Sequence, residues 1–336
     1  MANFRKKIFF SIFILLSSIV IFASFTYLMG KVLSKDISLE PISPKINPDF
    51  KNSNFSSRSG VYLISYANGP EVYYKNQNAL AASTLNKGID FILNYRRSLL
   101  DPLFVKQHAS ILNQKKGAGF WLWKPWIILK TLESIPENEI LIYADTGLLF
   151  RNPINSLIDL THQQDIILFE YDPEKYWGKP INVTKREVFK ALDCDTEQCH
   201  QGKHVWAGFL ILKNTPKSRD FIKRWLELCC NEKLLTDDLD PLVQQHSDFK
   251  KHYHDEAILN ALYNKNPSET FLFQSKVLFD KYATWHHRHS KIEDNSLLIA
   301  HYYNSYSKVY SILNELINND LILFCRQLFS KHNGSS

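Results

Sequence analysis

Residues 117–147 read GAGFWLWKPWIILKTLESIPENEILIYADTG and combine a glycine-rich loop, a helix and a strand. Pro125 can occupy the first turn of a helix that runs to Ser134. The stretch 137–145 then predicts a central strand, with Asp145 just beyond its carboxyl end. Open α/β sheets bind ligands in the crevice outside the carboxyl ends of their strands, so a carboxylate there could hold a divalent cation against a diphosphate. An aspartate that only forms a turn or caps a helix is the alternative.

Short apolar runs alternate with helical stretches on both sides of this segment, a pattern typical of a sheet flanked by helices. We expect strands at 61–65, 89–93, 165–169, 205–212 and 297–300. We expect helices at 77–86, 99–112, 184–192, 218–228 and 255–263, and from 311 to the carboxyl end. The sequence therefore predicts one α/β domain over residues 60–330, built on a mixed central sheet, with a less regular part between 231 and 254.

The amino-terminal region differs in composition from the rest. Residues 8–30, IFFSIFILLSSIVIFASFTYLMG, carry no charge and could form a helix that crosses a bilayer. Three basic residues at 5–7 precede this run, and the positive-inside rule keeps such a flank in the cytoplasm. We therefore expect a single-pass type II membrane protein with a cytoplasmic tail at 1–7, a signal anchor at 8–30 and a stalk at 31–59. It would reside in the Golgi or another secretory-pathway membrane if the cell is eukaryotic. A cleavable secretory signal is the alternative.

Charge and cysteine content restrict the class of protein. The formal net charge of +6 comes from basic residues that are scattered among 34 acidic ones, and no basic stripe or reader motif occurs. We therefore expect no nucleic-acid partner. Five cysteines occur without zinc-site spacing. An oxidising compartment would permit a bridge between Cys194 and Cys199, whereas five reduced and mostly buried cysteines are the equally open alternative.

The segment 117–147 resembles glycosyltransferases in which a Gly-aromatic-x-Trp-Lys-Pro segment opens a helix that leads into a strand ending Asp-x-Gly. The resemblance extends over residues 61–308 and is to the family 8 and family 32 nucleotide-sugar transferases, which implies their GT-A, Rossmann-like fold. In those enzymes an Asp-x-Asp motif at the strand end grips a manganese ion that neutralises the donor diphosphate. Here Gly147 stands at the second acidic position, so Asp145 is the motif's only carboxylate and metal dependence becomes an open question.

Two further segments resemble the same enzymes. The run VWAGFLILKNT at 205–215 is similar to the strand that lines their acceptor side, where Gly208 would permit close approach of a sugar or backbone. A buried strand that needs a glycine is the alternative. The run HYHDEAILNALY at 252–263 is similar to their Asp-Gln-x-x-Leu-Asn element, which implies catalytic roles for Asp255 and for Glu256, here in place of Gln. A helix cap alone would also explain the aspartate.

A last segment, LLIAHYYNSYSK at 297–308, resembles the family 8 element His-x-x-Gly-x-x-Lys, one residue longer and without its glycine. The resemblance makes His301 a metal ligand and brings Lys308 to the diphosphate. We therefore expect Asp145 and His301 to share one divalent cation. The donor-rich residues 285–289 are interpreted as a substrate-side loop.

The resemblance also predicts a pocket for the nucleotide-sugar donor. Its members are Ser83, Trp123, Lys124, Asp145, Gly208 and Lys308. The indoles of Trp121 and Trp123 could stack on a base or a sugar, or belong to the core.

These observations predict a membrane-anchored, hexosyltransferase-like enzyme that moves a sugar from a nucleotide-diphosphate donor to a glycan, glycoprotein or glycolipid. A catalytically inactive, membrane-tethered sugar-binding domain of the same fold is the alternative that the missing second aspartate supports. An anchored hydrolase is less favoured, because neither a GxSxG elbow nor an HExxH helix occurs.

Overall fold

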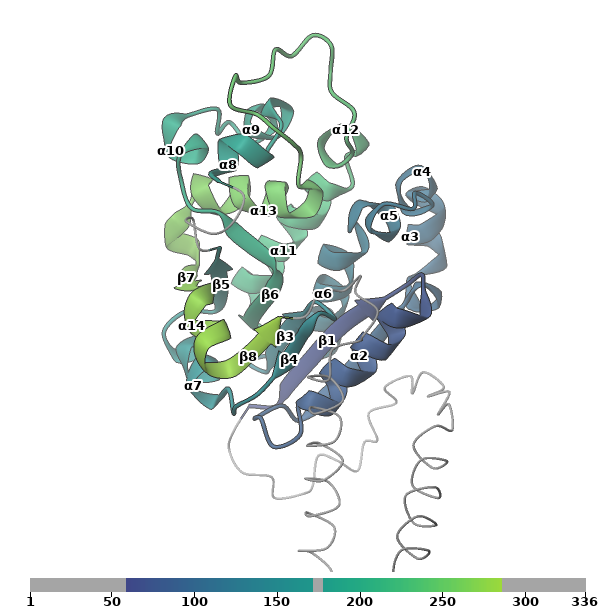
Figure 1. Cartoon of the computed structure of the whole chain (residues 1–336), viewed down its shortest axis with the longest axis vertical. Helices are drawn as coiled ribbons and strands as arrows, with labels where there is room; N and C mark the ends of the chain where they lie inside the picture. The colour runs from purple at the N-terminus through teal and green to yellow at the C-terminus, as the bar shows by residue number, and fades with distance from the viewer. Residues whose placement is uncertain (1–58, 172–177, 286–336) are drawn as a thin grey trace, which may run out of the picture. The chain divides into compact units, whose positions relative to one another are not determined.

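A six-stranded mixed sheet forms the centre of the described part of the chain (Figure 1). The computed structural model describes residues 59–171 and 178–285. The chain divides into two compact units, Met1–Ser57 and Arg58–Ser336, and the described residues belong to the second. In spatial order the strands are β2 (Phe91–Arg96), β1 (Val61–Ala67), β3 (Ile140–Ala144), β6 (Val205–Lys213), β5 (Ile166–Glu170) and β7 (Phe271–Gln274).

The strand directions make the sheet mixed. Strands β2, β1 and β3 are parallel, and so are β5 and β7. Strand β6 runs antiparallel to both of its neighbours, β3 and β5. A separate two-stranded sheet pairs β4 (Leu148–Phe150) with β8 (Ala283–Trp285). The amino-terminal part of β6 therefore lies beside the carboxyl end of β3.

Apolar side chains on both faces of the large sheet form the core. Every residue of β3 is buried. Leu141 and Tyr143 belong to one core cluster, whereas Ile140 and Ile142 belong to the other. Because successive side chains of a strand point to opposite faces, a strand covered on both sides reads as a continuous apolar run.

Helices cover these faces unequally. The helices α6 (Trp123–Ser134), α11 (Pro216–Cys229) and α13 (His254–Lys265) contribute to the first cluster, and α11 packs against both α6 and α13. Helix α2 (Glu71–Ser83) packs against β1 and β4 and contributes Leu80 to the second cluster. The remaining helices are short: α3 (Pro102–Gln107), α4 (Ala109–Leu112), α5 (Gly117–Phe120), α7 (Asn155–Ile158), α8 (Pro180–Val183), α9 (Arg186–Ala191), α10 (Glu197–His200), α12 (Glu232–Leu235), α14 (Ser275–Val277), η2 (Arg97–Leu99), η3 (Asp159–His162), η4 (Pro267–Glu269) and the π-helical η5 (Leu278–Tyr282).

The predicted mixed α/β architecture is confirmed for the described residues. The expected strands at 61–65, 137–145, 165–169 and 205–212 correspond to β1, β3, β5 and β6. The expected helices at 125–134, 184–192, 218–228 and 255–263 correspond to α6, α9, α11 and α13. Helix α11 begins at Pro216, two residues before the expected start at 218, because Pro216 occupies its first turn and Thr215 Oγ1 accepts a hydrogen bond from Ser218 N.

Some expected boundaries were wrong. The helix expected at 99–112 breaks at His108 into α3 and α4. The helix expected at 77–86 begins at Glu71 and ends at Ser83, because Asn86 and Gly88 have positive φ angles that an α-helix does not allow. The strand expected at 89–93 lies at Phe91–Arg96.

Several predictions fall outside the described residues. They are the cytoplasmic tail at 1–7, the anchor at 8–30, the stalk up to residue 58, the strand at 297–300 and the helix from 311 onward. Within residues 59–171 and 178–285, no helix combines the length and the apolar character that a membrane span needs.

Cys194 and Cys199 form a disulfide, as one of the two sequence alternatives allowed. Cys229 and Cys230 are free thiols, the first fully buried and the second half-buried. Burial raises the pKa of the Cys230 thiol to about 11, so this thiol is a poor nucleophile.

Candidate functional site

Asp145 directly follows β3, where the strand ends and the chain turns. Its backbone N–H donates to Gly208 O at 2.8 Å, and Leu148 N donates to Asp145 O at 3.1 Å. These bonds join the end of β3 to β6 and close the turn that leads into β4. The Tyr143 hydroxyl, two residues back on the same face of the strand, donates to Asp145 Oδ1. The carboxylate is therefore fixed in orientation, and its side chain is 4% exposed.

Lys124 brings a buried positive charge to this carboxylate. The side chain comes from the first turn of α6, and its Nζ lies 2.7 Å from Asp255 Oδ2 and 4.0 Å from Asp145 Oδ1. The ammonium also lies 5.5 Å from the ring centre of Tyr143, within the range of a cation–π contact. Two carboxylates and one ammonium thus share a site with little access to water.

Asp255 lies in the first turn of α13, but its side chain pairs with Lys124 instead of capping the helix. Its backbone carbonyl accepts a hydrogen bond of 2.9 Å from Trp225 Nε1, which ties this turn to α11. Burial raises the pKa of Asp255 to about 7, Lys124 opposes that rise, and the charges of Glu256 and Asp145 add to it. The carboxyl can therefore gain or lose a proton near neutral pH.

Strained backbone lies on both sides of the Lys124–Asp255 pair. Residues 117–121 all have positive φ angles, including Ala118 at 52° and Trp121 at 60°. A Cβ atom on Gly119 would lie 2.6 Å from Leu112 Cα, so only glycine fits there. On the opposite side His254 has a φ of 52°. Non-glycine residues adopt this region at an energetic cost, and such residues cluster at functional sites.

The two strained segments contact each other. The ring of His254 stacks on Trp121 with centroids 5.5 Å apart. His254 Nδ1 bonds to Leu235 O at 2.9 Å, and burial lowers the pKa of this imidazole to about 4. A neutral aromatic stack therefore connects the loop before α6 to the start of α13, and it helps to place Lys124 opposite Asp255.

Glu256 holds β6 rather than facing Lys124. Its Oε2 accepts a hydrogen bond from Ala207 N at 3.0 Å, and its Oε1 lies 3.2 Å from His204 Nε2. One turn further along α13, Asn260 bonds both backbone atoms of Val205, accepting at 2.6 Å and donating at 3.1 Å. Glu256 and Asn260 therefore fix the start of β6 against α13. Sequence reasoning missed Asn260, although its i, i+4 spacing from Glu256 could have placed both on one helical face.

Gly208 lies in β6, and its carbonyl accepts the bond from Asp145 N. The space that a side chain would occupy is filled by the indole of Trp206, which a Cβ atom would contact. This packing supports the alternative that the buried strand itself requires glycine.

Replacing Gly208 with alanine should therefore lower the free energy of unfolding by about 1–3 kcal/mol, because the added methyl must displace a buried indole. Urea unfolding monitored by tryptophan fluorescence measures this change. The matched control is Asn78→Ala, which introduces the same alanine at an exposed position of α2. A Gly208→Ala protein as stable as the parent would show that Trp206 moves aside freely.

The remaining predicted donor residues lie in different surroundings. Trp123 is 4% exposed, its ring stacks on Tyr66 with centroids 3.9 Å apart, and its Nε1 donates to Gly117 O. Its indole therefore belongs to the core. Ser83 Oγ donates to Leu80 O and accepts from Phe150 N, at the end of α2, so its observed partners stabilise the fold.

The structure brings together Lys124, Asp145 and Asp255 from segments that are distant in sequence. His301 and Lys308 lie outside the described residues, as does most of the 285–289 cluster. The predicted sharing of one cation by Asp145 and His301 thus stays a prediction.

The described fold is similar to solved structures of low sequence identity. No protein-family model and no curated protein matches the chain. Among solved structures, mouse xyloside xylosyltransferase 1 is 10% identical, with 64% of this chain and 84% of that chain covered and a TM-score of 0.39. The galactosyltransferase LgtC with donor and acceptor sugar analogues is 16% identical, covering 69% and 80%, with a TM-score of 0.36. A glycosyltransferase that acts in glycosylation of the PBCV-1 major capsid is 12% identical, covering 64% and 82%, with a TM-score of 0.36. All three are glycosyltransferases, the class of enzyme that the sequence predicts, but likenesses this distant leave the function to be inferred from the site.

Proposed function

We propose that this chain is a glycosyltransferase that moves a sugar from a nucleotide-diphosphate donor to a glycan acceptor. The observation that carries the proposal is the buried group of Lys124, Asp145 and Asp255 beside the carboxyl end of β3. Ligands of open α/β sheets bind at such strand ends. A buried ammonium between two carboxylates, flanked by strained backbone, is a costly arrangement that a purely structural role does not need.

The reaction explains the residue types. When a nucleoside diphosphate leaves the sugar, negative charge develops on its phosphate oxygens and must be neutralised. Lys124 supplies a cation at this position. An anion that approaches Lys124 would raise the pKa of Asp255, so that carboxyl would take up a proton and release the ammonium from their ion pair. Asp145, fixed by Tyr143, remains to orient the donor.

The described donors fit a resident divalent cation poorly. Asp145 is the single carboxylate of the strand-end motif, its Oδ1 accepts a hydrogen bond from the Tyr143 hydroxyl, and the Lys124 ammonium lies 4.0 Å away. A cation would compete with that ammonium for the same oxygen. We therefore propose that a divalent ion, manganese by the resemblance, binds only together with the phosphate oxygens of the donor.

The finer features of the function are proposals that rest on the sequence. They include a glycoprotein or glycolipid as the acceptor, anchoring through residues 8–30, and a lumenal location in the Golgi or another secretory membrane. The disulfide between Cys194 and Cys199 supports an oxidising compartment, because such bonds are rare where thiols are kept reduced.

Nucleotide binding tests the proposal. Calorimetry of the full-length protein in detergent should detect uridine or guanosine diphosphate, with tighter binding when manganese is present. Lys124→Met should weaken this binding, whereas the exposed Lys130→Met on the same helix should not. Absence of binding by every nucleoside diphosphate at millimolar concentration would refute the proposal.

The inactive sugar-binding domain remains a second candidate, because Gly147 replaces the second acidic residue of the motif. A panel of nucleotide sugars separates the two functions. An enzyme releases nucleoside diphosphate in the presence of an acceptor, whereas a binding domain retains glycan affinity without any release.

A further inference from the structure

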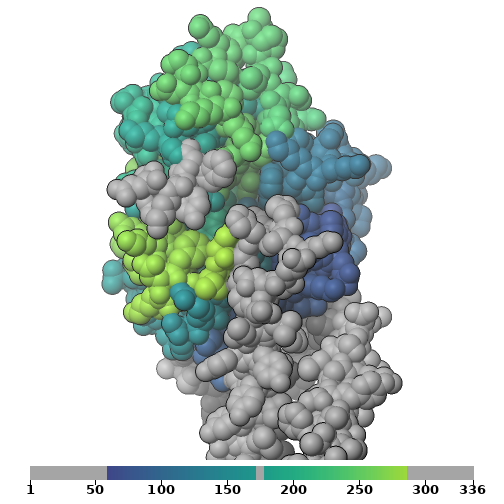
Figure 2. Space-filling model, viewed as in Figure 1, coloured from purple at the N-terminus to yellow at the C-terminus, as the bar shows by residue number. Residues whose placement is uncertain are grey.

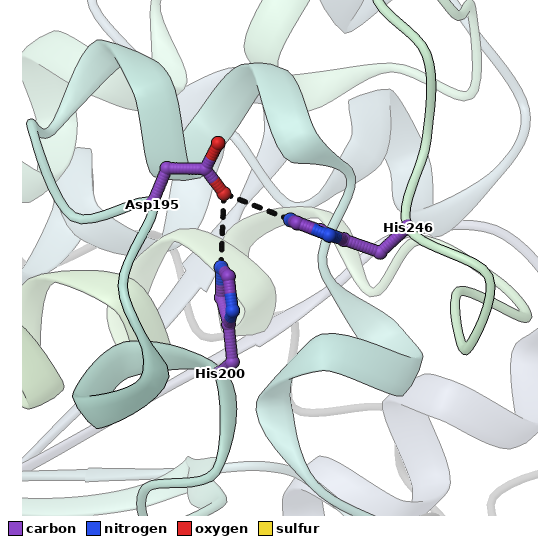
Figure 3. A group of neighbouring side chains, drawn as sticks. All are labelled: Asp195, His200 and His246. Atoms are coloured by element: carbon purple, nitrogen blue, oxygen red, sulfur yellow. Dashed lines mark hydrogen bonds and ion pairs between the residues drawn. The ribbon is translucent and has the colours of Figure 1, made fainter.

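A second group of polar side chains uses none of the residues above. Asp195 Oδ1 lies 2.9 Å from His200 Nε2 and 2.8 Å from His246 Nε2. Figure 3 shows that both imidazoles point at this one oxygen. One ligand atom from each residue lies within 4.8 Å of the others. Two imidazole nitrogens and one carboxylate oxygen therefore converge on a small volume.

The disulfide holds two of these side chains in place. Asp195 directly follows Cys194 and lies within the short loop that the disulfide closes, whereas His200 directly follows Cys199 and lies just outside that loop. His200 N donates to the loop residue Thr196, at its carbonyl oxygen, over 2.9 Å. The disulfide restricts the backbone next to Asp195 and His200, so these side chains lose little conformational entropy when they bind an ion.

A neighbouring arginine orients the carboxylate. Arg186 Nε donates to Asp195 Oδ2 at 2.7 Å, which directs Oδ1 toward the imidazoles. The ring of Phe189 lies 4.9 Å from that of His200 and 6.2 Å from that of His246, and so forms an apolar wall beside them. Partners that orient a ligating carboxylate are a regular feature of metal sites.

His246 belongs to residues 236–253, the irregular segment between α12 and α13. Figure 2 shows this segment in green on the surface of the described part. Gln245 Oε1 accepts a hydrogen bond from Arg186 N at 2.8 Å, and Gln245 Nε2 donates to Glu187 Oε2 at 2.7 Å. The segment therefore already contacts α9, and it leads directly into α13.

We propose that Asp195, His200 and His246 bind one zinc ion, with a water molecule as fourth ligand. Zinc favours tetrahedral sites of imidazole and carboxylate donors, whereas magnesium and manganese favour oxygen. Ligand atoms of such a site lie about 3.4 Å apart, so Asp195 Oδ1 and each Nε2 must separate by roughly half an ångström to admit the ion. Each Nε2 then presents its lone pair in place of its proton. The ion links His246 of segment 236–253 to Asp195 and His200, which lie between α9 and the end of α10.

Metal content and calorimetry test this site. The full-length protein is stripped with a chelator and then titrated with zinc chloride in the absence of nucleotide. We expect one zinc ion per chain. Replacing the ion with cobalt should give the intense visible absorption of a tetrahedral nitrogen and oxygen site, which a hydrogen-bonded cluster without metal would lack.

Variants assign the ion to these residues. His246→Ala and His200→Ala should each weaken zinc binding by more than about 100-fold, since the loss of outer partners alone weakens metal sites by 10–100-fold. The exposed His162→Ala is the control and should bind zinc as the parent does. Asp145→Asn should also retain the ion, which separates this site from the donor site.

A structural readout accompanies the binding data. Zinc should protect segment 236–253 of the parent protein from limited proteolysis, and it should not protect this segment in His246→Ala. Circular dichroism establishes that the variant is folded. A parent protein that retains no zinc at micromolar free ion, or a folded His246→Ala that binds zinc as tightly as the parent, would overturn the proposal.

Discussion

Replacing Lys124 with methionine should lower the free energy of unfolding by about 3–5 kcal/mol at about pH 8, because it leaves two buried carboxylates without their cation. Lys124 and its two partners are each only 4% exposed at the side chain. Methionine matches the aliphatic part of lysine, so the expected loss arises from the missing charge and not from a cavity. Urea unfolding of the parent and variant proteins measures it.

This loss should depend on pH in a defined direction. Burial raises the pKa of Asp255 to about 7 in the parent, and Lys124 opposes that rise. Without Lys124 the pKa rises further. A carboxyl with a raised folded-state pKa stabilises the fold at low pH and loses that contribution as the pH rises from its unfolded value, about 4, through the folded value. The loss of stability caused by Lys124→Met should therefore be about 1 kcal/mol smaller near pH 5 than at pH 8, and it should continue to grow above pH 8.

The matched control is Lys130→Met, which removes an exposed ammonium from the same helix. Its partner Glu133 is 44% exposed, so the variant should change stability by less than about 1 kcal/mol at either pH. If Lys124→Met proved as stable as Lys130→Met at pH 8, the buried ion pair would not hold the site together.

The sequence predicted the central sheet well because burial leaves a simple pattern. Strands β3 and β6 are covered on both faces and read as unbroken apolar runs. By contrast, β4 and β8 have three residues each and pair only with one another, so their existence depends on tertiary contacts and not on local periodicity.

The sequence predicted which residues form the site, but it did not predict that Lys124 pairs with Asp145 and Asp255. Asp145 followed from the end of a strand, and Lys124 and Asp255 from the resemblance. Their convergence depends on left-handed backbone at Ala118 and His254, which local propensity opposes. Neither periodicity nor spacing signals such conformations, because the rest of the fold imposes them.

The zinc site was missed for a related reason. Zinc sites that a sequence reveals have cysteine and histidine at short, regular spacings, whereas His246 lies 51 residues from Asp195 in a segment without helices or strands. Cys194 and Cys199 indicated the closed loop, but only the folded chain brings the third ligand to it.

Replacing Asp145 with asparagine should reduce sugar transfer by more than about 100-fold while preserving the fold. Asparagine keeps the shape of the side chain, and its Oδ1 can still accept the hydrogen bond from the Tyr143 hydroxyl. The packing around β3 should therefore persist. The substitution removes the negative charge that orients the donor. It thereby also removes the only acidic residue of the strand-end motif. Release of nucleoside diphosphate from a nucleotide sugar, with acceptor present, measures the change.

The exposed Asp248→Asn variant serves as the control for this prediction, because it removes the same charge from a surface position. It should transfer sugar at the parental rate. Thermal unfolding of Asp145→Asn should occur within a few degrees of the parent, which separates a lost function from a lost fold. A folded Asp145→Asn protein with parental activity would show that the strand-end carboxylate takes no part in transfer, and the donor site would then have to be sought away from β3.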